Sequence, residues 1–334
     1  MKIGIIGSPQ SGKTTIFKIL LHKDVSGNIG IFKIIDSRVE EISRIFSSKK
    51  TTYPEFTFVD LGPTSGFNKK YLSQLQDIDL FICVVGAFFS EDPKKDFENS
   101  LTDVILSDLE VIQDRIAILK KGGKKGDISR EIKILEKSQA FVSEGKLLGN
   151  AGLDANEEML LSGFILLSLK PLILAINMPE EGAEALGSKI KLLEDYCSSK
   201  DIRYIRFFGK TESELLELGS EERKKFLIEL GPGYNFREDV SRLISKELDL
   251  LTFFTTGEKE TRGWYLKSGL PVIEAAGKIH SDMKRGFIRA EIVNYEDFIK
   301  HGSMHKAREA GVLKVEGKDY IVRDGDMVNV RFNV

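Results

Sequence analysis

Three features of the sequence predict an α/β chain with a doubly wound, mostly parallel sheet, a helical insertion and a small C-terminal α+β domain. A short apolar run at residues 3–6 leads into a glycine-bearing turn and a helix-like stretch, the order of a strand followed by a helix. Residues 98–142 carry apolar side chains at three- and four-residue steps, as packed helices do. From residue 251 short strand-like runs separated by turns take over. A chain of 334 residues is also long enough for two or three domains.

The composition is that of a globular chain, with 41% apolar residues, 30% charged residues and a net charge of -2. It excludes a disordered chain and predicts no membrane-spanning segment. Because the charge is nearly balanced, contact with nucleic acid would need a local basic patch. The start, MKIGIIGSPQ, does not have the pattern of a signal peptide, and Cys83 and Cys197 show no pairing or metal-binding spacing. We therefore expect a cytoplasmic protein with buried thiols.

The stretch GSPQSGKT at residues 7–14 follows the first apolar run and precedes a helix-like segment. It fits the pattern G-x-x-x-x-G-K-S/T, in which backbone N–H groups and the helix dipole face a phosphate anion. Lys13 would reach the β- and γ-phosphates, and the Thr14 hydroxyl would ligate Mg²⁺. The alternative is a glycine-rich turn that only resembles the motif. The predicted nucleotide-binding residues here are Gly7, Pro9, Gln10, Ser11, Gly12, Lys13, Thr14 and Thr15.

The two loops that would sense the γ-phosphate are short. The expected helix runs from Lys13 to about His22 and the next strand begins near Ile29, and no threonine lies between Thr15 and Thr51. Six connecting residues reach about 20 Å when fully extended, which leaves no slack to wrap a phosphate. In VDLGPTSGFNKKYL, at residues 59–72, Asp60 stands where a metal-supporting aspartate belongs, but glycine follows after only two residues. We expect Thr14 and Asp60 to hold Mg²⁺ and hydrolysis to be slow.

Residues 98–142 predict an antiparallel helical hairpin whose two arms are separated by KKGGKKGD at residues 120–127. The seam repeats at positions 101, 105, 109, 112, 116 and 119, a coiled-coil-like spacing. The tip would carry four lysines: Lys120, Lys121, Lys124 and Lys125. They are either a solvated turn or a basic tip that contacts RNA phosphates.

A second buried strand, residues 171–176, ends in Asn177, Met178, Pro179 and Glu180. GTP-binding switch proteins carry N-K-x-D at this place, where the aspartate accepts from the guanine N1–H and N2 amino group. A longer glutamate removes that short acceptor, while Asn177 retains the donor and acceptor that suit an adenine edge. We therefore predict ATP over GTP, with Asn177, Met178 and Glu180 at the base and Gly209 with Lys210 in the last loop over it. The alternative is an ordinary strand-end turn.

The last eighty residues predict two strands around Gly257, a helix, a strand, a short helix and a hairpin from Val312 onwards. This order suggests a separate α+β, grasp-like domain. Because no catalytic type of His, Cys or carboxylate cluster occurs in this stretch, a binding role is expected.

The order of these segments resembles the YchF family of Obg-like ATPases. The resemblance rests on GSPQSGKTTIF (7–17), DPKKDFEN (92–99), KPLILAINMPE (170–180), KTESELLELGSEER (210–223), FFTTGEKETRGW (253–264) and EGKDYIVRDGDMVNVRFNV (316–334). It implies a P-loop NTPase domain, a coiled-coil insertion and a terminal TGS domain of ubiquitin-like (β-grasp) fold. It also implies ATP in preference to GTP, and association with ribosomes. Family members carry a longer first switch with a threonine and then D-x-x-G, so this chain departs from the family at both switches.

These observations together predict a nucleotide-binding domain at residues 1–92 and 166–250, a helical insertion at 93–165 and a TGS domain at 251–334. The expected function is an ATP-binding switch or adaptor with slow hydrolysis, which contacts the ribosome or RNA through the TGS domain and the lysine tip. Two alternatives stay open: a nucleotide-binding scaffold that does not switch, and a P-loop kinase.

Overall fold

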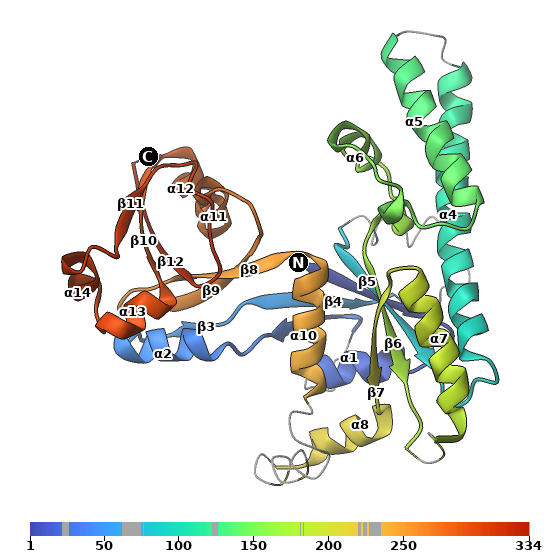
Figure 1. The fold of residues 1–334 in the computed structure, drawn as a ribbon, viewed down its shortest axis with the longest axis horizontal. Coiled ribbons are helices and arrows are strands. Elements are labelled where there is room, and N and C mark those ends of the chain that lie inside the picture. Colours follow the sequence, from blue (N-terminus) through green and yellow to red (C-terminus); the bar gives the residue numbers. More distant parts are fainter. Residues whose placement is uncertain are drawn as a thin grey trace. The chain divides into compact units, whose positions relative to one another are not determined.

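A computed structural model describes residues 1–21, 27–61, 75, 77–121, 126–180, 182, 184–219, 222, 226 and 235–333. Internal contacts divide these residues into two compact units (Figure 1). Unit 1 comprises Met1–Gly30 and Thr57–Val240, and unit 2 comprises Ile31–Phe56 and Ser241–Val334.

Unit 1 contains most of a six-stranded sheet with the order β2-β4-β1-β5-β6-β7, in which residues 31–33 of β2 and 55–56 of β4 belong to unit 2. Strand β1 pairs in parallel with β4 on one side and β5 on the other, and β5-β6 and β6-β7 are also parallel. The order therefore reverses direction at β1, the position where doubly wound sheets bind ligands beyond the carboxyl ends of their strands. The predicted fold class is confirmed. The strands are β1 (Lys2–Gly7), β2 (Ile29–Lys33), β4 (Glu55–Asp60), β5 (Leu80–Gly86), β6 (Leu172–Asn177) and β7 (Arg203–Phe207).

Helices cover this sheet because its central strands are apolar along their whole length, and β5 and β6 are buried at every position. One hydrophobic cluster joins alternate residues of β5 and β6, such as Cys83 and Leu174, to Leu101 of α4 and Leu193 of α7. Helix α1 packs beside α8. The helical segments of this region are α1 (Lys13–Leu21), α4 (Pro93–Lys121), α5 (Gly126–Ser143), η1 (Leu148–Asn150), α6 (Ala155–Leu161), η2 (Leu167–Leu169), η3 (Glu184–Leu186), α7 (Gly187–Ser199), α8 (Gly209–Glu217) and α10 (Phe236–Glu247), whose last residues belong to unit 2.

The predicted helical hairpin is present as α4 and α5, which lie side by side as a long arm (Figure 1). Its seam buries Ile112, Ile116 and Leu135, at the spacing that the sequence indicates. Of the predicted tip lysines, Lys120 donates to Glu136 Oε1 at 2.8 Å, whereas residues 124 and 125 lie outside the described residues.

A buried carboxylate fixes the base of the arm to the sheet. Asp108 on α4 is fully buried and accepts from the Leu167 N–H at 2.7 Å, the Ser168 N–H at 2.8 Å and the Ser168 hydroxyl. Burial raises the pKa of Asp108 to about 6, and the hydrogen bonds from Ser168 and Leu167 offset part of that rise. Since η2 leads directly into β6, Asp108 positions the strand that ends in Asn177.

Unit 2 contains a second sheet with the order β11-β10-β12-β8-β9-β3. Its strands are β3 (Thr51–Thr52), β8 (Leu250–Thr255), β9 (Thr261–Lys267), β10 (Phe287–Asn294), β11 (Lys314–Glu316) and β12 (Asp326–Phe332). Its helices are α2 (Ser37–Ile45), α11 (Val272–Ile279), α12 (Ser281–Arg285), α13 (Tyr295–His301) and α14 (Met304–Glu309). The two strands predicted around Gly257 are present as β8 and β9, and they pair antiparallel.

The predicted C-terminal hairpin is wrong. Strands β11 and β12 do not pair with each other, because each pairs antiparallel with β10, on its opposite edges. The turn residues between them return the chain across β10 instead of closing a two-stranded ribbon.

An early segment of the chain contributes to unit 2. Strand β3 pairs in parallel with β9, with Thr51 opposite Thr261, and Val39 and Ile42 of α2 share a hydrophobic cluster with Phe254 and Phe298. Contacts therefore group Ile31–Phe56 with the C-terminal region, whereas the sequence-based boundaries placed these residues in the nucleotide-binding domain.

Candidate nucleotide-binding site

The predicted phosphate loop connects β1 to α1 at the carboxyl end of the sheet. Its backbone is left-handed or strained at Gly7 (φ 143°), Gln10 (φ 62°) and Gly12 (φ 102°). A Cβ on Gly7 would lie 2.3 Å from the carbonyl oxygen of Val84, so only glycine fits there. The first N–H groups of α1 have no partner within the helix, and they face the loop with the positive end of the helix dipole. The loop therefore has the form of an anion-binding cradle.

Lys13 lies at the start of α1 with its side chain folded over this loop. Its ammonium donates to the Gly7 carbonyl at 2.9 Å and to the Ser8 carbonyl at 2.6 Å, and the residue is buried. Burial lowers the pKa of Lys13, although the nearby charge of Asp60 opposes that shift. A buried cation whose hydrogen bonds, among the described residues, go to carbonyl oxygens would gain from a phosphate anion at the same place.

The two predicted metal ligands are brought together. Ile5 of β1 lies opposite Asp60 of β4, so the carboxyl ends of these strands meet beside the phosphate loop. The Thr14 hydroxyl donates to Asp60 Oδ2 at 3.2 Å. Hydroxyl and carboxylate oxygens suit Mg²⁺, which commonly takes its other ligands from phosphate and water. A hydroxyl and a carboxylate oxygen this close together fit an ion whose other ligands come from a nucleotide phosphate and water.

Asn177 ties the phosphate loop to the loop that follows β7. Its side chain is 5% exposed, its Nδ2 donates to the Ser11 carbonyl at 3.2 Å, and its Oδ1 accepts from the Gly209 N–H at 3.0 Å. A Cβ on Gly12 would lie 2.3 Å from Asn177 Nδ2, and one on Gly209 would lie 2.7 Å from Oδ1. These two glycines make room for the amide, a role that the sequence interpretation missed when it assigned Asn177 to the base alone. These two bonds use one N–H and the oxygen of the amide.

Glu180 and Lys210 also come together, as the prediction of a shared base loop requires. Lys210 Nζ lies 3.2 Å from Glu180 Oε2, and the Thr211 hydroxyl donates to Glu180 Oε1 at 2.7 Å. Burial alone would raise the pKa of Glu180, but the hydrogen bonds from Thr211 and Lys210 lower it. Glu180 is therefore an ionised acceptor whose two oxygens are already engaged. Thr211 was not predicted, because no residue pattern separates it from an ordinary first-turn threonine.

The remaining predicted residues differ in how far they are buried and in the hydrogen-bonding groups they present. Met178 is 6% exposed and packs in the hydrophobic cluster under the sheet, so its side chain supports the core. Pro9 and Gln10 are exposed on the loop, and Thr15 is half-buried. Ser11 is fully buried, and its hydroxyl has no hydrogen-bond partner among the described residues, which leaves it available to a phosphate oxygen. The second switch, from Gly62 onwards, lies outside the described residues.

Known proteins share this arrangement along the whole chain. The "Ribosome-binding ATPase YchF" of Bacillus subtilis (strain 168) is 34% identical over 362 residues, covering 99% of this chain and 99% of the relative. The chain belongs to the YchF family. A YchF protein of Mycoplasma genitalium, with the same description, is 30% identical over 366 residues and covers 100% of both chains.

Two further comparisons agree with membership of the YchF family. The family model YchF-GTPase_C, described as a protein of unknown function (DUF933), matches residues 250–333. The structure of the Schizosaccharomyces pombe YchF GTPase superposes with a TM-score of 0.87 at 22% identity, covering 99% of this chain and 97% of that one, so the two share a fold. In the part of the chain that the structure describes, no helix combines the length and apolar character needed to cross a membrane.

Proposed function

We propose that this YchF-family chain binds Mg²⁺ and a purine nucleotide, ATP in preference to GTP, and acts at the ribosome as a switch or adaptor with slow hydrolysis. The observation that supports this best is the convergence of three elements at the carboxyl edge of one sheet. They are the loop closed by Lys13, the Thr14–Asp60 oxygen pair and the Glu180–Lys210 pair.

The phosphate part of the site follows from charge and backbone geometry. Lys13 would exchange its two carbonyl acceptors for β- and γ-phosphate oxygens, and the N–H groups at the start of α1 would donate to the same anion. Thr14 and Asp60 would hold Mg²⁺, Asp60 through water. When bound, the ion neutralises charge on the β- and γ-phosphates.

The base preference follows from the hydrogen bonds that the Glu180 carboxylate already accepts. A guanine would need a free carboxylate to accept from its N1–H and N2 amino group together. Both Glu180 oxygens already accept from Thr211 and Lys210, so a guanine edge would have to share the carboxylate with these two donors. Adenine has no N1–H to satisfy, and its N7 can accept from an N–H of the Asn177 amide. The geometry thus favours ATP.

Ribosome association and slow hydrolysis rest on the relatives and the sequence. The relatives carry the description "Ribosome-binding ATPase", and this cytoplasmic chain would use its C-terminal unit and the arm tip for the same contact. The alignment with the Bacillus subtilis relative covers 362 positions, more than the 334 residues here, in keeping with shortened loops. Without a threonine between Thr15 and Thr51, closure over the metal is incomplete. In phosphoryl-transfer enzymes, a group that stabilises the charge of the transition state raises the rate about 10³–10⁵-fold.

Calorimetric titration of the full chain with ATP, GTP and ADP, each with and without Mg²⁺, tests the nucleotide assignment. We expect ATP to bind more tightly than GTP, and Mg²⁺ to strengthen ATP binding. Lys13→Ala should weaken the binding of ATP at least about tenfold, because a charge-assisted hydrogen bond to phosphate contributes roughly 1.5–3 kcal/mol. Lys18→Ala, an exposed lysine on the same helix, is the matched control. Tighter binding of GTP would contradict the base assignment.

Pelleting with ribosomes through a sucrose cushion separates a switch from a scaffold. A switch should be retained to different extents with ADP and with a non-hydrolysable ATP analogue. Equal retention in both states would favour a non-switching scaffold, and no retention in either state would overturn the ribosome assignment.

A further inference from the structure

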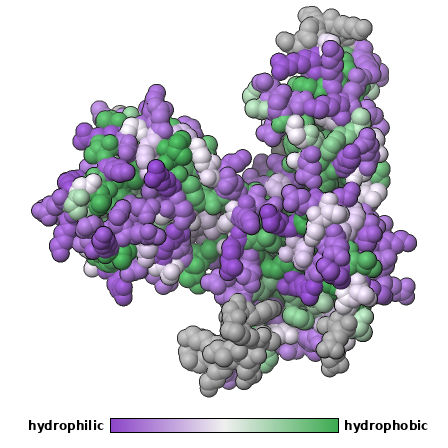
Figure 2. Space-filling model, in the orientation of Figure 1, coloured by the Kyte–Doolittle hydropathy of each residue, from purple (hydrophilic) through white to green (hydrophobic). Residues whose placement is uncertain are grey.

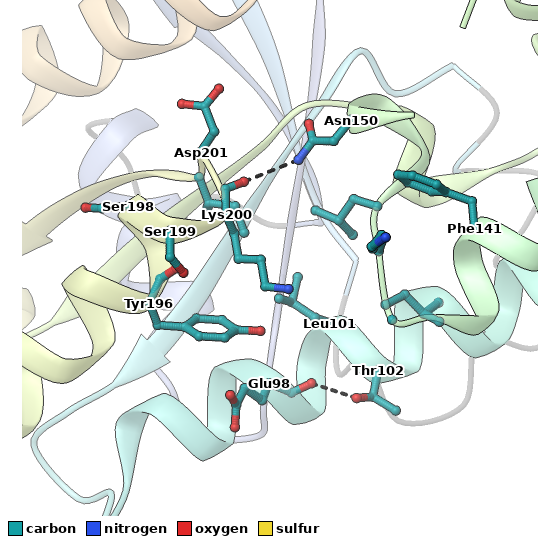
Figure 3. A pocket seen from close by; sticks show the side chains of 15 residues that line it. Glu98, Leu101, Thr102, Phe141, Asn150, Tyr196, Ser198, Ser199, Lys200 and Asp201 are labelled. Atoms are coloured by element: carbon teal, nitrogen blue, oxygen red, sulfur yellow. Dashed lines mark hydrogen bonds between the residues drawn. The ribbon is translucent and has the colours of Figure 1, made fainter. Parts of the chain in front are cut away.

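A second cavity lies within unit 1, at the base of the helical arm and away from the phosphate loop. It has a volume of about 850 Å³ and is enclosed by α4, the turn after α5, and the end of α7 with its connection to β7 (Figure 3). This volume lies within the range of about 300–1,000 Å³ that is typical of small-molecule sites. None of its lining residues belongs to the nucleotide site described above.

Apolar and aromatic side chains form one part of the cavity lining, and polar and charged side chains form the rest. Leu101 of α4 and Ile202 at the start of β7 are 6% exposed and continue the hydrophobic cluster beneath the sheet. Tyr196 of α7 and Phe141 of α5 contribute aromatic side chains to the lining (Figure 3). A flat apolar body would bury its faces against these surfaces.

Two donors meet in this cavity. The Lys200 ammonium lies 5.9 Å from the centre of the Tyr196 ring, and Figure 3 shows the Lys200 and Tyr196 side chains ending in the same part of the cavity. Burial and then the charge of Glu98 raise the pKa of Tyr196, so its phenol keeps its proton and can donate. Asp201 also lines the cavity, but its carboxylate points away from this position (Figure 3).

Lys200 is exposed and brings a positive charge to this part of the cavity. Among the described residues, no carboxylate forms an ion pair with Lys200. By contrast, the neighbouring Lys146 is paired with Glu144 at 2.5 Å, and Glu98 is paired with Lys94 at 3.5 Å. A cation without a carboxylate partner among the described residues, beside a phenol donor, matches one negative charge. A dianionic phosphate would require a second unpaired cation.

We propose that this cavity binds a small aromatic carboxylate. The carboxylate accepts from the Lys200 ammonium and the Tyr196 hydroxyl, and the aromatic body lies on the apolar part of the lining beside Tyr196 and Phe141. Such a ligand would bridge the arm and the segment that leads into β7, which ends two residues before Gly209 of the nucleotide site.

The test uses 2-naphthoate as a probe, because its fluorescence polarisation reports binding to the full chain directly. We expect saturable one-to-one binding that ATP does not displace. The neutral isostere 2-naphthamide should bind about tenfold or more weakly, since it lacks the charge that Lys200 would pair with.

Variants locate the probe. Lys200→Met should weaken 2-naphthoate about tenfold or more, Lys200→Arg should keep most of the affinity, and Tyr196→Phe should cost about threefold to tenfold. Lys191→Met, on the helix that ends just before Lys200 but outside the cavity, is the matched control and should bind 2-naphthoate as the unaltered chain does. Unchanged melting temperatures would show that the variants fold. Absence of saturable binding, equal affinity for the amide, unchanged affinity in Lys200→Met or displacement by ATP would each overturn the assignment.

Discussion

Replacing Asn177 by alanine should loosen the nucleotide site from within, without removing any group that contacts a phosphate. The amide of Asn177 holds the Ser11 carbonyl on one side and the Gly209 N–H on the other. Both of these residues are buried, so water cannot replace the lost partner. The phosphate loop and the base loop would then lose their shared support.

The expected magnitude follows from the two orphaned groups. A buried donor or acceptor left without a partner costs roughly 1–3 kcal/mol. Two such groups should lower the free energy of unfolding of unit 1 by about 2–4 kcal/mol, after partial relaxation. A unit of roughly 200 residues shifts its melting temperature by about 2–4 °C per kcal/mol, so the midpoint should fall by about 4–16 °C.

Thermal unfolding and nucleotide titration of the variant measure both consequences. Asn150→Ala is a matched control, because Asn150 Nδ2 donates to the Lys200 carbonyl at the same 3.2 Å but at an exposed position. The control should change stability by less than about 1 kcal/mol. Asn177→Ala should weaken the binding of ATP and of ADP to similar extents, because Asn177 supports the loop that would bind the phosphates common to both nucleotides. A melting temperature within about 2 °C of the unaltered chain would refute the reasoning.

Two further predictions concern the same unit. The pKa of Asp108 is raised to about 6 from about 3.9 in the unfolded chain, so the folded state holds the proton more tightly. The stabilisation that this protonated carboxyl gives to the folded state is complete below about pH 3.9 and is lost as the pH rises to about 6. In denaturant unfolding between about pH 4.5 and 7, the free energy of unfolding of the unaltered chain should therefore fall by about 2 kcal/mol relative to that of Asp108→Asn. A difference between the two chains that does not change with pH would contradict this prediction. Gly7→Ala should weaken ATP at least about tenfold by calorimetry, because strain at a positive φ costs on the order of 1–3 kcal/mol and the new Cβ meets Val84 O at 2.3 Å. Gly187→Ala, where a Cβ meets nothing within 4 Å, should bind as the unaltered chain does, and equal binding by both variants would refute the steric argument.

The phosphate loop could be predicted because its requirements are local. Glycine at 7 and 12, lysine at 13 and a hydroxyl at 14 determine a backbone path and a charge within eight residues. The pairing of Thr14 with Asp60 was also within reach, since the carboxyl ends of adjacent parallel strands meet at one edge of a sheet. In both cases the structure brings together the residues that the sequence singles out.

Other parts of the site depend on contacts between segments far apart in the chain. Met178 falls within a recognisable base-loop motif, yet its side chain fills the core, since its orientation depends on how β6 is covered by helices. The lysine and threonine that engage both oxygens of Glu180 follow it by about thirty residues. Hydrophobic periodicity in the sequence does not indicate which residues so far apart will contact each other.

The sequence by itself determined the order of the elements, the phosphate loop, the helical arm and the family, because each depends on short patterns or on similarity along the chain. Tertiary structure decided which strands pair, placing β11 and β12 on opposite edges of β10 and β3 beside β9. It also decided that Asn177 ties two loops together and that Lys200 and Tyr196 share a cavity. The physical reason is that a strand or a side chain selects its partner by burial and hydrogen bonding across the fold.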